Sequence, residues 1–160
     1  MNCRKHIFVF VNVVIALFMT QSAHANDRFT YSANGAEVTD ESTGLTWRRC
    51  SEGQVWINDR CVGKASEHNY KGALAHAKSR ATRQAAWRVP SIEELGTLVE
   101  RSARPAAIDV SAFPDTVSNR YWSSSPHETD ATQAMIVLFK DGHVFKYHRN
   151  NKAFLRLVRN

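Results

Sequence analysis

The sequence has few of the residues from which metal, redox and catalytic sites are usually built. It contains three cysteines and four prolines among 160 residues. It has no Cys-x-x-Cys pair, no His-x-x-x-His spacing and no Gly-x-Ser-x-Gly motif around a nucleophilic serine. We therefore expect no metal ion, no cofactor and no enzymatic activity.

Long hydrophobic runs are also scarce, with one exception near the N-terminus. The apolar stretch from Ile7 to Met19 follows Arg4 and Lys5 and precedes the triplet Ala23-His24-Ala25. It is shorter than the roughly 20 residues that a membrane span needs, whereas the small residues after it suit signal peptidase. We expect residues 1–25 to be a signal peptide and the exported protein, periplasmic or extracellular, to have no membrane span after cleavage.

No Pro-, Gly- or Ser-rich linker, internal repeat or low-complexity tract divides the remaining chain. Residues 26–160 are therefore expected to form one domain. Loss of Arg4 and Lys5 with the leader lowers the formal charge from +6 to +4. This charge is spread without a basic run, so it favours acidic polysaccharide over nucleic acid as a partner, although it serves solubility equally well.

Two cysteines, Cys50 and Cys61, remain after cleavage, and in an oxidising compartment we expect them to form a disulfide. The segment between them contains residues 55–57 and 60–62 on either side of Asn58-Asp59, which predicts a short hairpin. Closing this loop would stabilise the fold by roughly 2–3 kcal/mol, so we interpret the bond as structural.

The hydrophobic patterns predict an α+β fold, with two helices packed on antiparallel β-hairpins. Small apolar residues at helical spacing predict a first helix over residues 70–86. A capping box of Ser91 and Glu94 predicts a second helix that ends before Pro105. Alternation predicts hairpins over 36–48 and, around Asp141-Gly142, over 134–148; a closing strand is expected over 154–159, and 111–125 has the composition of a loop.

Several short blocks occur in a fixed order along the chain: Val38-Thr39-Asp40, Thr43-Gly44-Leu45-Thr46-Trp47, Trp87-Arg88-Val89-Pro90-Ser91, Phe113-Pro114-Asp115-Thr116, Tyr121-Trp122-Ser123-Ser124 and Arg156-Leu157-Val158-Arg159. This ordered set resembles the bacterial Lcl C-terminal domain family, also known as DUF1566. The resemblance implies a secreted or surface-exposed domain with a fold related to C-type-lectin-like and formylglycine-generating-enzyme folds. In a collagen-like adhesin of Legionella this domain binds sulfated glycosaminoglycans. The chain has no collagen-like tract, and it lacks the calcium-dependent Glu-Pro-Asn and Trp-Asn-Asp motifs of C-type lectins.

A group of cations in the last third of the chain is the candidate ligand site. Lys146 and His148 alternate with Phe145 and Tyr147 along a predicted strand, so the cations share one face. The candidate ligand-binding residues are Arg120, Lys146, His148, Arg149 and Lys152. They suit sulfate or carboxylate groups, which Arg binds bidentately; the alternative is a solvated basic edge that prevents strand addition.

Four tryptophans are either sugar-stacking platforms or core residues, and we favour the core because large aromatic side chains dominate protein interiors. They are Trp47, Trp56, Trp87 and Trp122.

Together the features of this sequence predict a secreted, non-catalytic binding module for anionic glycans or cell-surface polysaccharide. The alternative is an envelope protein-interaction component, such as an accessory subunit or inhibitor. The sequence leaves the oligomeric state open.

Overall fold

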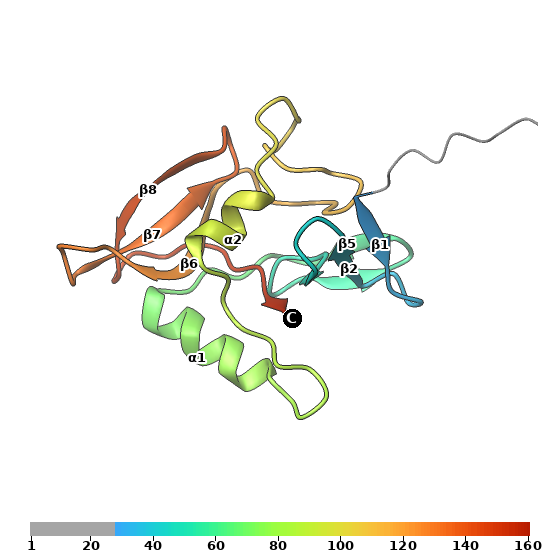
Figure 1. Cartoon of the computed structure of the whole chain (residues 1–160), viewed down its shortest axis with the longest axis horizontal. Helices are drawn as coiled ribbons and strands as arrows, with labels where there is room; N and C mark the ends of the chain where they lie inside the picture. Colours follow the sequence, from blue (N-terminus) through green and yellow to red (C-terminus); the bar gives the residue numbers. More distant parts are fainter. Residues whose placement is uncertain (1–27) are drawn as a thin grey trace, which may run out of the picture.

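The computed structural model describes residues 28–160, so the expected signal peptide over residues 1–25 lies outside the described part of the chain. The described residues form three antiparallel sheets and two helices (Figure 1). The sheets have the strand orders β1-β2-β3-β9, β4-β5 and β6-β7-β8. The elements are β1 (Phe29–Tyr31), β2 (Glu37–Asp40), β3 (Leu45–Arg48), β4 (Val55–Ile57), β5 (Arg60–Val62), α1 (Tyr70–Arg80), α2 (Ile92–Thr97), β6 (Arg120–Pro126), β7 (Gln133–Leu138), β8 (His143–His148) and β9 (Val158–Arg159). The predicted α+β class is confirmed, and its relation to C-type-lectin-like folds stays a prediction.

The first hairpin forms where the sequence predicts it. β2 and β3 pair from Glu37↔Arg48 to Asp40↔Leu45, and Gly44 has a φ of +70° in the loop between them. Glycine adopts this left-handed conformation without steric cost. β1 was not predicted, because a three-residue strand with one buried side chain, Phe29, is too short to give a recognisable pattern.

The disulfide between Cys50 and Cys61 is confirmed. β4 and β5 pair up to Ile57↔Arg60, which leaves a two-residue turn. Both turn residues, Asn58 and Asp59, have positive φ angles, as the twist of a tight hairpin requires. The predicted hairpin between the cysteines is therefore also confirmed.

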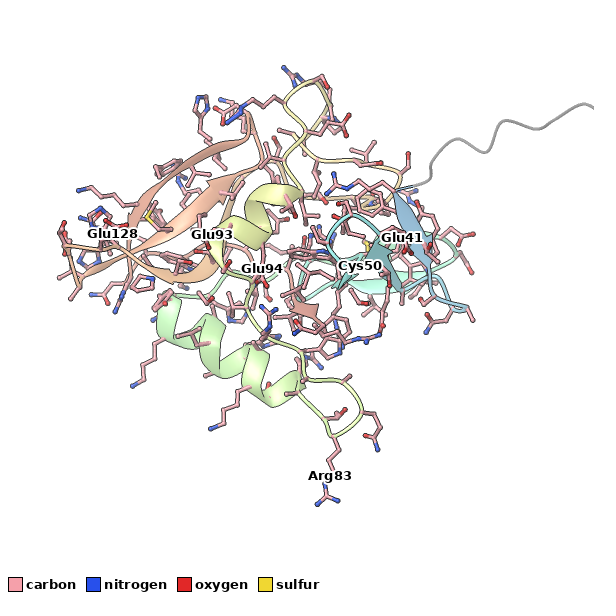
Figure 2. All side chains as sticks on the ribbon, viewed as in Figure 1. Glu41, Cys50, Arg83, Glu93, Glu94 and Glu128 are labelled. Carbon is pink, nitrogen blue, oxygen red and sulfur yellow. A yellow bond between two sulfur atoms is a disulfide. The ribbon has the colours of Figure 1, made fainter. Side chains whose placement is uncertain are left out.

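α2 begins with the predicted capping box. The Ser91 hydroxyl accepts a hydrogen bond from the Glu94 N–H (3.2 Å), and the Glu94 carboxylate accepts one from the Ser91 N–H (2.8 Å). The helix ends at Thr97, ahead of Pro105. Its first turn carries Glu93 and Glu94 (Figure 2), where acidic residues favour the positive end of the helix dipole.

α1 is shorter than predicted, because it ends at Arg80 instead of residue 86. Ala81 is extended, with a ψ of 132°. The Ala85 N–H donates a hydrogen bond to Thr82 Oγ1 (3.0 Å), so the threonine hydroxyl closes a separate turn that competes with the helix. The residues that α1 buries are Tyr70, Ala73 and Ala77.

β6 lies within a segment that the sequence predicts as a loop. The segment is rich in serine, but Ser123 is buried and its hydroxyl donates a hydrogen bond to the Met135 carbonyl (2.7 Å). The Ser124 N–H donates to the Pro90 carbonyl (2.7 Å). Because neighbouring carbonyls satisfy these polar groups, serine occupies a buried strand here.

The C-terminal hairpin has a longer loop than predicted. β7 and β8 pair up to Leu138↔His143, so the loop spans residues 139–142 and not Asp141-Gly142 alone. Phe139 is fully buried with its ring 5.1 Å from that of Tyr121, and its N–H still donates to the Asn119 carbonyl next to β6 (2.9 Å). Pairing with β8 stops here because the Gly142 N–H donates back to the Leu138 carbonyl (2.8 Å) and closes the loop.

The predicted closing strand over residues 154–159 is reduced to β9. Val158 pairs with Trp47 of β3 and also forms a bridge with Arg88. The alternation suggested by the sequence is absent, because Leu155, Arg156, Leu157 and Val158 are all fully buried. This segment is therefore enclosed by neighbouring elements on every side.

Within the three-stranded sheet, β6 and β7 bury side chains on both faces, whereas β8 is largely exposed. Tyr121 and Val137 belong to a cluster that contains Trp47 and the apolar residues of α2. Trp122 and Ile136 belong to a second cluster that contains the alanines of α1. The two cores thus share one sheet, and adjacent residues 121 and 122 contribute to different cores.

Candidate functional site

The predicted ligand-binding cations are divided between the two faces of the three-stranded sheet. Ile136 pairs with both Trp122 and Phe145, so these three side chains share a face. Arg120, two residues before Trp122, lies on that same face. Arg120 is the first residue of β6 and not part of a loop. On β8, the exposed cations that alternate to the opposite face are Lys146 and His148.

Two of the predicted arginines stack on aromatic rings. The Arg120 guanidinium lies 5.2 Å from the ring centre of Tyr147. The Arg149 guanidinium lies 4.7 Å from the ring centre of Tyr70, and its Nε donates a hydrogen bond to the Gln133 carbonyl (3.1 Å). Stacking of this kind fixes the plane of a guanidinium while leaving its edge free to donate.

Arg149 also lines a groove at the start of α1. The groove has a volume of about 450 Å³. Its lining residues are Asn69, Tyr70, Lys71, Leu74, Arg149 and Asn150. Among residues 28–160, neither Lys71 nor Arg149 forms an ion pair. The first turn of α1 has no acidic residue, so the positive end of the helix dipole is not offset there.

The structure adds Lys71 to the predicted set and places Lys152 on the exposed segment just after Asn150. Lys71 was not identified from the sequence, because a lysine on the polar side of an amphipathic helix is the ordinary case. What distinguishes it is its position opposite Arg149, which comes from a segment almost eighty residues later in the chain. The groove thus presents two cations beside side-chain amides and an aromatic ring, a combination that suits an anionic group.

A second charged group lies around the buried side chain of Glu52, which is 3% exposed. Its Oε2 is 2.6 Å from His76 Nε2 and 3.4 Å from Arg80 Nε, and its Oε1 is 3.6 Å from Arg48 Nη1. One carboxylate therefore faces two arginines and a histidine. No local pattern in the sequence indicated this group, because its members lie on β3, on the loop before β4 and on α1.

His68 extends this group without completing a catalytic relay. Its Nε2 lies 2.9 Å from Ser66 Oγ, and its ring stacks on that of His76 with centroids 4.7 Å apart. Burial lowers the pKa of His68, and the neighbouring His76 lowers it further. The Glu52 carboxylate contacts His76 and not His68, so among residues 28–160 no carboxylate orients His68 beside Ser66 as in a hydrolase triad.

No three histidine, cysteine, aspartate or glutamate side chains within residues 28–160 are grouped closely enough to hold a metal ion.

The four tryptophans differ in how deeply they are buried. Trp47 and Trp122 are fully buried and Trp87 is 4% exposed, so the core interpretation is confirmed for these three. Trp56 is half-buried and lines a pocket, so the core interpretation is wrong for this residue.

Residues 36–159 match the family model described as the Lcl C-terminal domain. This match agrees with the ordered blocks in the sequence and covers most of the chain. No curated protein is similar to the chain at a significant level. Within the described residues, no helix has both the length and the apolar character needed to cross a membrane.

Proposed function

The chain belongs to the Lcl C-terminal domain family, and from this membership we propose that it is a secreted, non-catalytic binding module for anionic glycans. The observation that carries the proposal is the groove at the start of α1. There, Lys71 and Arg149 face the same space without an acidic partner among the described residues. Exposed Lys152, two residues after Asn150, would extend the basic surface beside it, whereas Lys146 and His148 point to the opposite face of the sheet.

The groove favours an extended polyanion over a compact one. Its rim is open and its cations come from α1 and from residues 149–152, so successive acidic groups of a polymer could contact successive cations. Contacts of this kind are exposed, and each contributes about 0.2–1 kcal/mol. Binding should therefore depend on several cations together and weaken as salt screens them.

Retention on a heparin column at increasing salt concentrations tests the proposal. The double variant Lys71→Glu/Lys152→Glu should elute at much lower salt, and Arg149→Gln should have a smaller effect in the same direction. Both lysines are exposed, and an acidic residue at position 71 suits the first turn of α1, so the double variant should keep its fold. Salt-independent retention, or full retention by the double variant, would contradict the proposal.

Arg83→Glu is the matched control. Figure 2 shows Arg83 pointing away from the fold in the loop that follows α1. Like each of the two lysine substitutions, it replaces a positive charge with a negative one. Residue 83, however, lies at the other end of α1 from the groove. Retention of this variant should fall only slightly, because the substitution alters the overall field and not the groove.

A protein-binding role in the envelope is the second candidate. One face of the β4–β5 hairpin exposes three large aliphatic side chains, and a contiguous apolar patch of this kind favours a protein-interaction surface. They are Val55, Ile57 and Val62, between 48% and 60% exposed. A purified envelope protein that binds with fixed stoichiometry in high salt, and that is lost in Val55→Ser/Val62→Ser, would favour this role over glycan binding.

A further inference from the structure

A pocket of about 350 Å³ lies between the turn before β2, the start of β4 and the last turn of α1. It shares no lining residue with the groove at the start of α1. The side chains that matter for its chemistry are Asn34, Arg48, Glu52, Trp56 and Arg80. The pocket therefore combines an aromatic ring, an amide and two arginines around a buried carboxylate.

The charges in this pocket do not balance. Glu52 is the sole acidic contact of both Arg48 and Arg80 among residues 28–160. The other acid in the lining, Glu37, already has a partner in Arg159, with 2.9 Å between Oε2 and Nη2. One carboxylate is thus shared between two guanidinium groups, and a second anion would be favourable beside them.

Glu52 attracts both arginines without forming a hydrogen bond to either. Its carboxylate is 3% exposed and is fixed by the 2.6 Å contact with His76, so it forms the floor of the cluster. The contacts to Arg80 and Arg48, at 3.4 and 3.6 Å, are long for hydrogen bonds. The side chains of Arg48 and Arg80 remain 36% and 48% exposed, so their N–H groups can still donate to a ligand.

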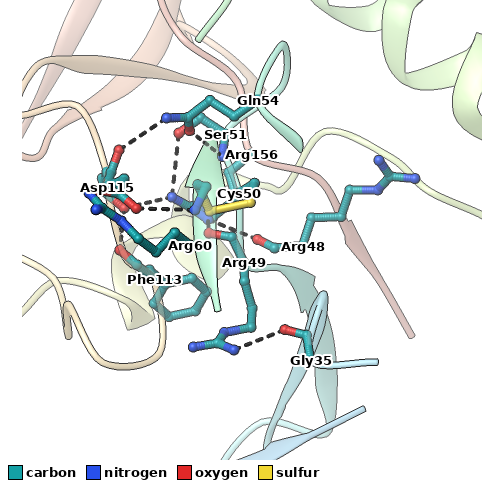
Figure 3. Close-up of a disulfide and its surroundings, with 12 residues drawn as sticks. Gly35, Arg48, Arg49, Cys50, Ser51, Gln54, Arg60, Phe113, Asp115 and Arg156 are labelled. Carbon is teal, nitrogen blue, oxygen red and sulfur yellow. Dashed lines mark hydrogen bonds and ion pairs between the residues drawn. A yellow bond between two sulfur atoms is a disulfide. The ribbon is translucent and has the colours of Figure 1, made fainter. Parts of the chain in front are cut away.

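Trp56 is held rigidly beside these charges. The Arg49 guanidinium lies 4.1 Å from the Trp56 ring centre, and Arg49 is itself anchored by hydrogen bonds to the carbonyls of Gly35 and Ala112. Figure 3 shows Arg49 pointing toward Gly35 while Arg48 extends in another direction. A Cβ at Gly35 would lie 3.0 Å from Trp56 Nε1, so the backbone closely borders the indole.

We propose that this pocket binds a single acidic pyranose unit, of the hexuronate type, within a glycan chain. The sugar ring would pack against Trp56, and its planar carboxylate would accept hydrogen bonds from Arg48 and Arg80. Asn34 accepts from the Ala36 N–H through Oδ1, which leaves its Nδ2 to donate to a sugar hydroxyl. The inference rests on the proposed glycan-binding function and assigns it a specific sugar and a second site.

The test uses the mature protein and unsulfated trigalacturonate as the probe. A change in tryptophan fluorescence on titration reports binding, and its loss in Trp56→Phe assigns the change to Trp56 and not to Trp87, whose ring centre lies 5.0 Å from the Arg48 guanidinium. We expect a saturable change with trigalacturonate and none with galactotriose, in which each carboxylate is replaced by a neutral CH₂OH group. An equal response to both sugars, or to neither, would overturn the proposal.

Two single variants near the C-terminus of α1 test whether Arg80 contacts the ligand. Arg80→Gln should weaken trigalacturonate binding by about tenfold, because a charge-assisted hydrogen bond is lost at an exposed position that the fold does not need. Arg83→Gln, three residues further along, should bind as the wild type does. Normal affinity in Arg80→Gln would also overturn the pocket assignment.

The groove variant Lys71→Glu/Lys152→Glu distinguishes this inference from the proposed function. If it loses heparin retention but keeps the fluorescence response to trigalacturonate, the two sites are independent, as proposed. If heparin retention depends on the groove and trigalacturonate gives no response in the wild type, the pocket assignment fails while the proposed function stands. Loss of both responses in this variant would show that the groove binds both ligands, which also overturns the pocket assignment.

Discussion

Arg156 donates a hydrogen bond of 2.7 Å from Nη2 to Thr116 Oγ1, and both residues are buried. The same guanidinium donates through Nη1 to the carbonyls of Arg48 and Arg49. It also lies 4.8 Å from the ring centre of Phe113. One side chain thus joins the C-terminal segment to the end of β3 and to the loop before β6.

The structure predicts that this arginine cannot be replaced by lysine. Arg156 is fully buried, and burial lowers its pKa although the nearby Tyr121 and Glu52 act in the opposite direction. The substitution Arg156→Lys would keep the charge, but a single ammonium group could not reach several acceptors at once. We expect the free energy of unfolding in urea to fall by about 2–4 kcal/mol.

Arg60→Lys is the control for this substitution. Its side chain is 73% exposed, and its contact with Asp115 is a surface ion pair at 3.4 Å. Such a change should alter the free energy of unfolding by no more than about 0.5 kcal/mol. Equal urea midpoints for Arg156→Lys and the wild type would show that the buried network contributes little.

Much of the fold could be predicted because its signals are local. The capping box of α2, the turn at Asn58-Asp59 and the pairing of Cys50 with Cys61 each depend on residues close in sequence. The errors arose where distant segments decide the structure. The serine-rich strand β6 was missed, because the Met135 and Pro90 carbonyls that satisfy its polar groups come from other segments of the chain.

The candidate site could be predicted only in part, because its residues come from segments that are far apart in the sequence. Arg149 was identified from its cationic neighbours along the chain, but its partner in the groove, Lys71, comes from α1. The cluster around Glu52 was missed entirely, because His76 and Arg80 reach it from a helix that follows the disulfide hairpin. The spacing of residues along a sequence can predict a site whose residues all lie on one helix or strand. In this protein the residues of each pocket come from several helices, strands and loops.

Removal of the disulfide should destabilise the protein without unfolding it. The bond joins residues 11 apart, and closing a loop of this length contributes about 2–3 kcal/mol in the chain-entropy model. The double variant Cys50→Ser/Cys61→Ser should therefore unfold at lower urea concentrations than the oxidised wild type. Reduced wild type is the matched control, and its midpoint should lie close to that of the variant.

Protonation of Glu94 should lower stability at acidic pH. Hydrogen bonds from Arg88, at 2.7 Å to each carboxylate oxygen, lower the pKa of Glu94 below its usual 4.5, although partial burial opposes them. Because the folded-state pKa is the lower one, the stabilisation is complete above about pH 5 and is lost as pH falls through the folded-state value. Urea midpoints between pH 3 and 7 measure this loss.

The variant Glu94→Gln isolates this contribution. It should be less stable than the wild type by about 1 kcal/mol at pH 7 and should lose less stability between pH 5 and pH 3. Glu128→Gln, which removes an exposed carboxylate that forms no ion pair among residues 28–160, should retain the pH dependence of the wild type. Identical profiles for wild type and Glu94→Gln would show that other carboxylates control the acid transition.

Trp122 and Trp56 should respond in opposite ways to truncation. Trp122 is fully buried, its indole N–H donates to the His68 carbonyl (2.7 Å), and its ring lies 5.5 Å from that of Tyr70. Trp122→Ala should lower the free energy of unfolding by about 3–5 kcal/mol, because a large cavity would open in the core. The protein should then melt much earlier or fail to accumulate.

Trp56→Phe should instead preserve most of the stability, because the ring is half-exposed and phenylalanine can still stack beneath Arg49. It should weaken trigalacturonate binding, since the smaller ring offers less area to a sugar. Thermal melting and calorimetric titration of both variants separate the two roles. An unchanged melting temperature in Trp122→Ala would contradict its core role, and unchanged trigalacturonate affinity in Trp56→Phe would argue against a stacking role for that ring.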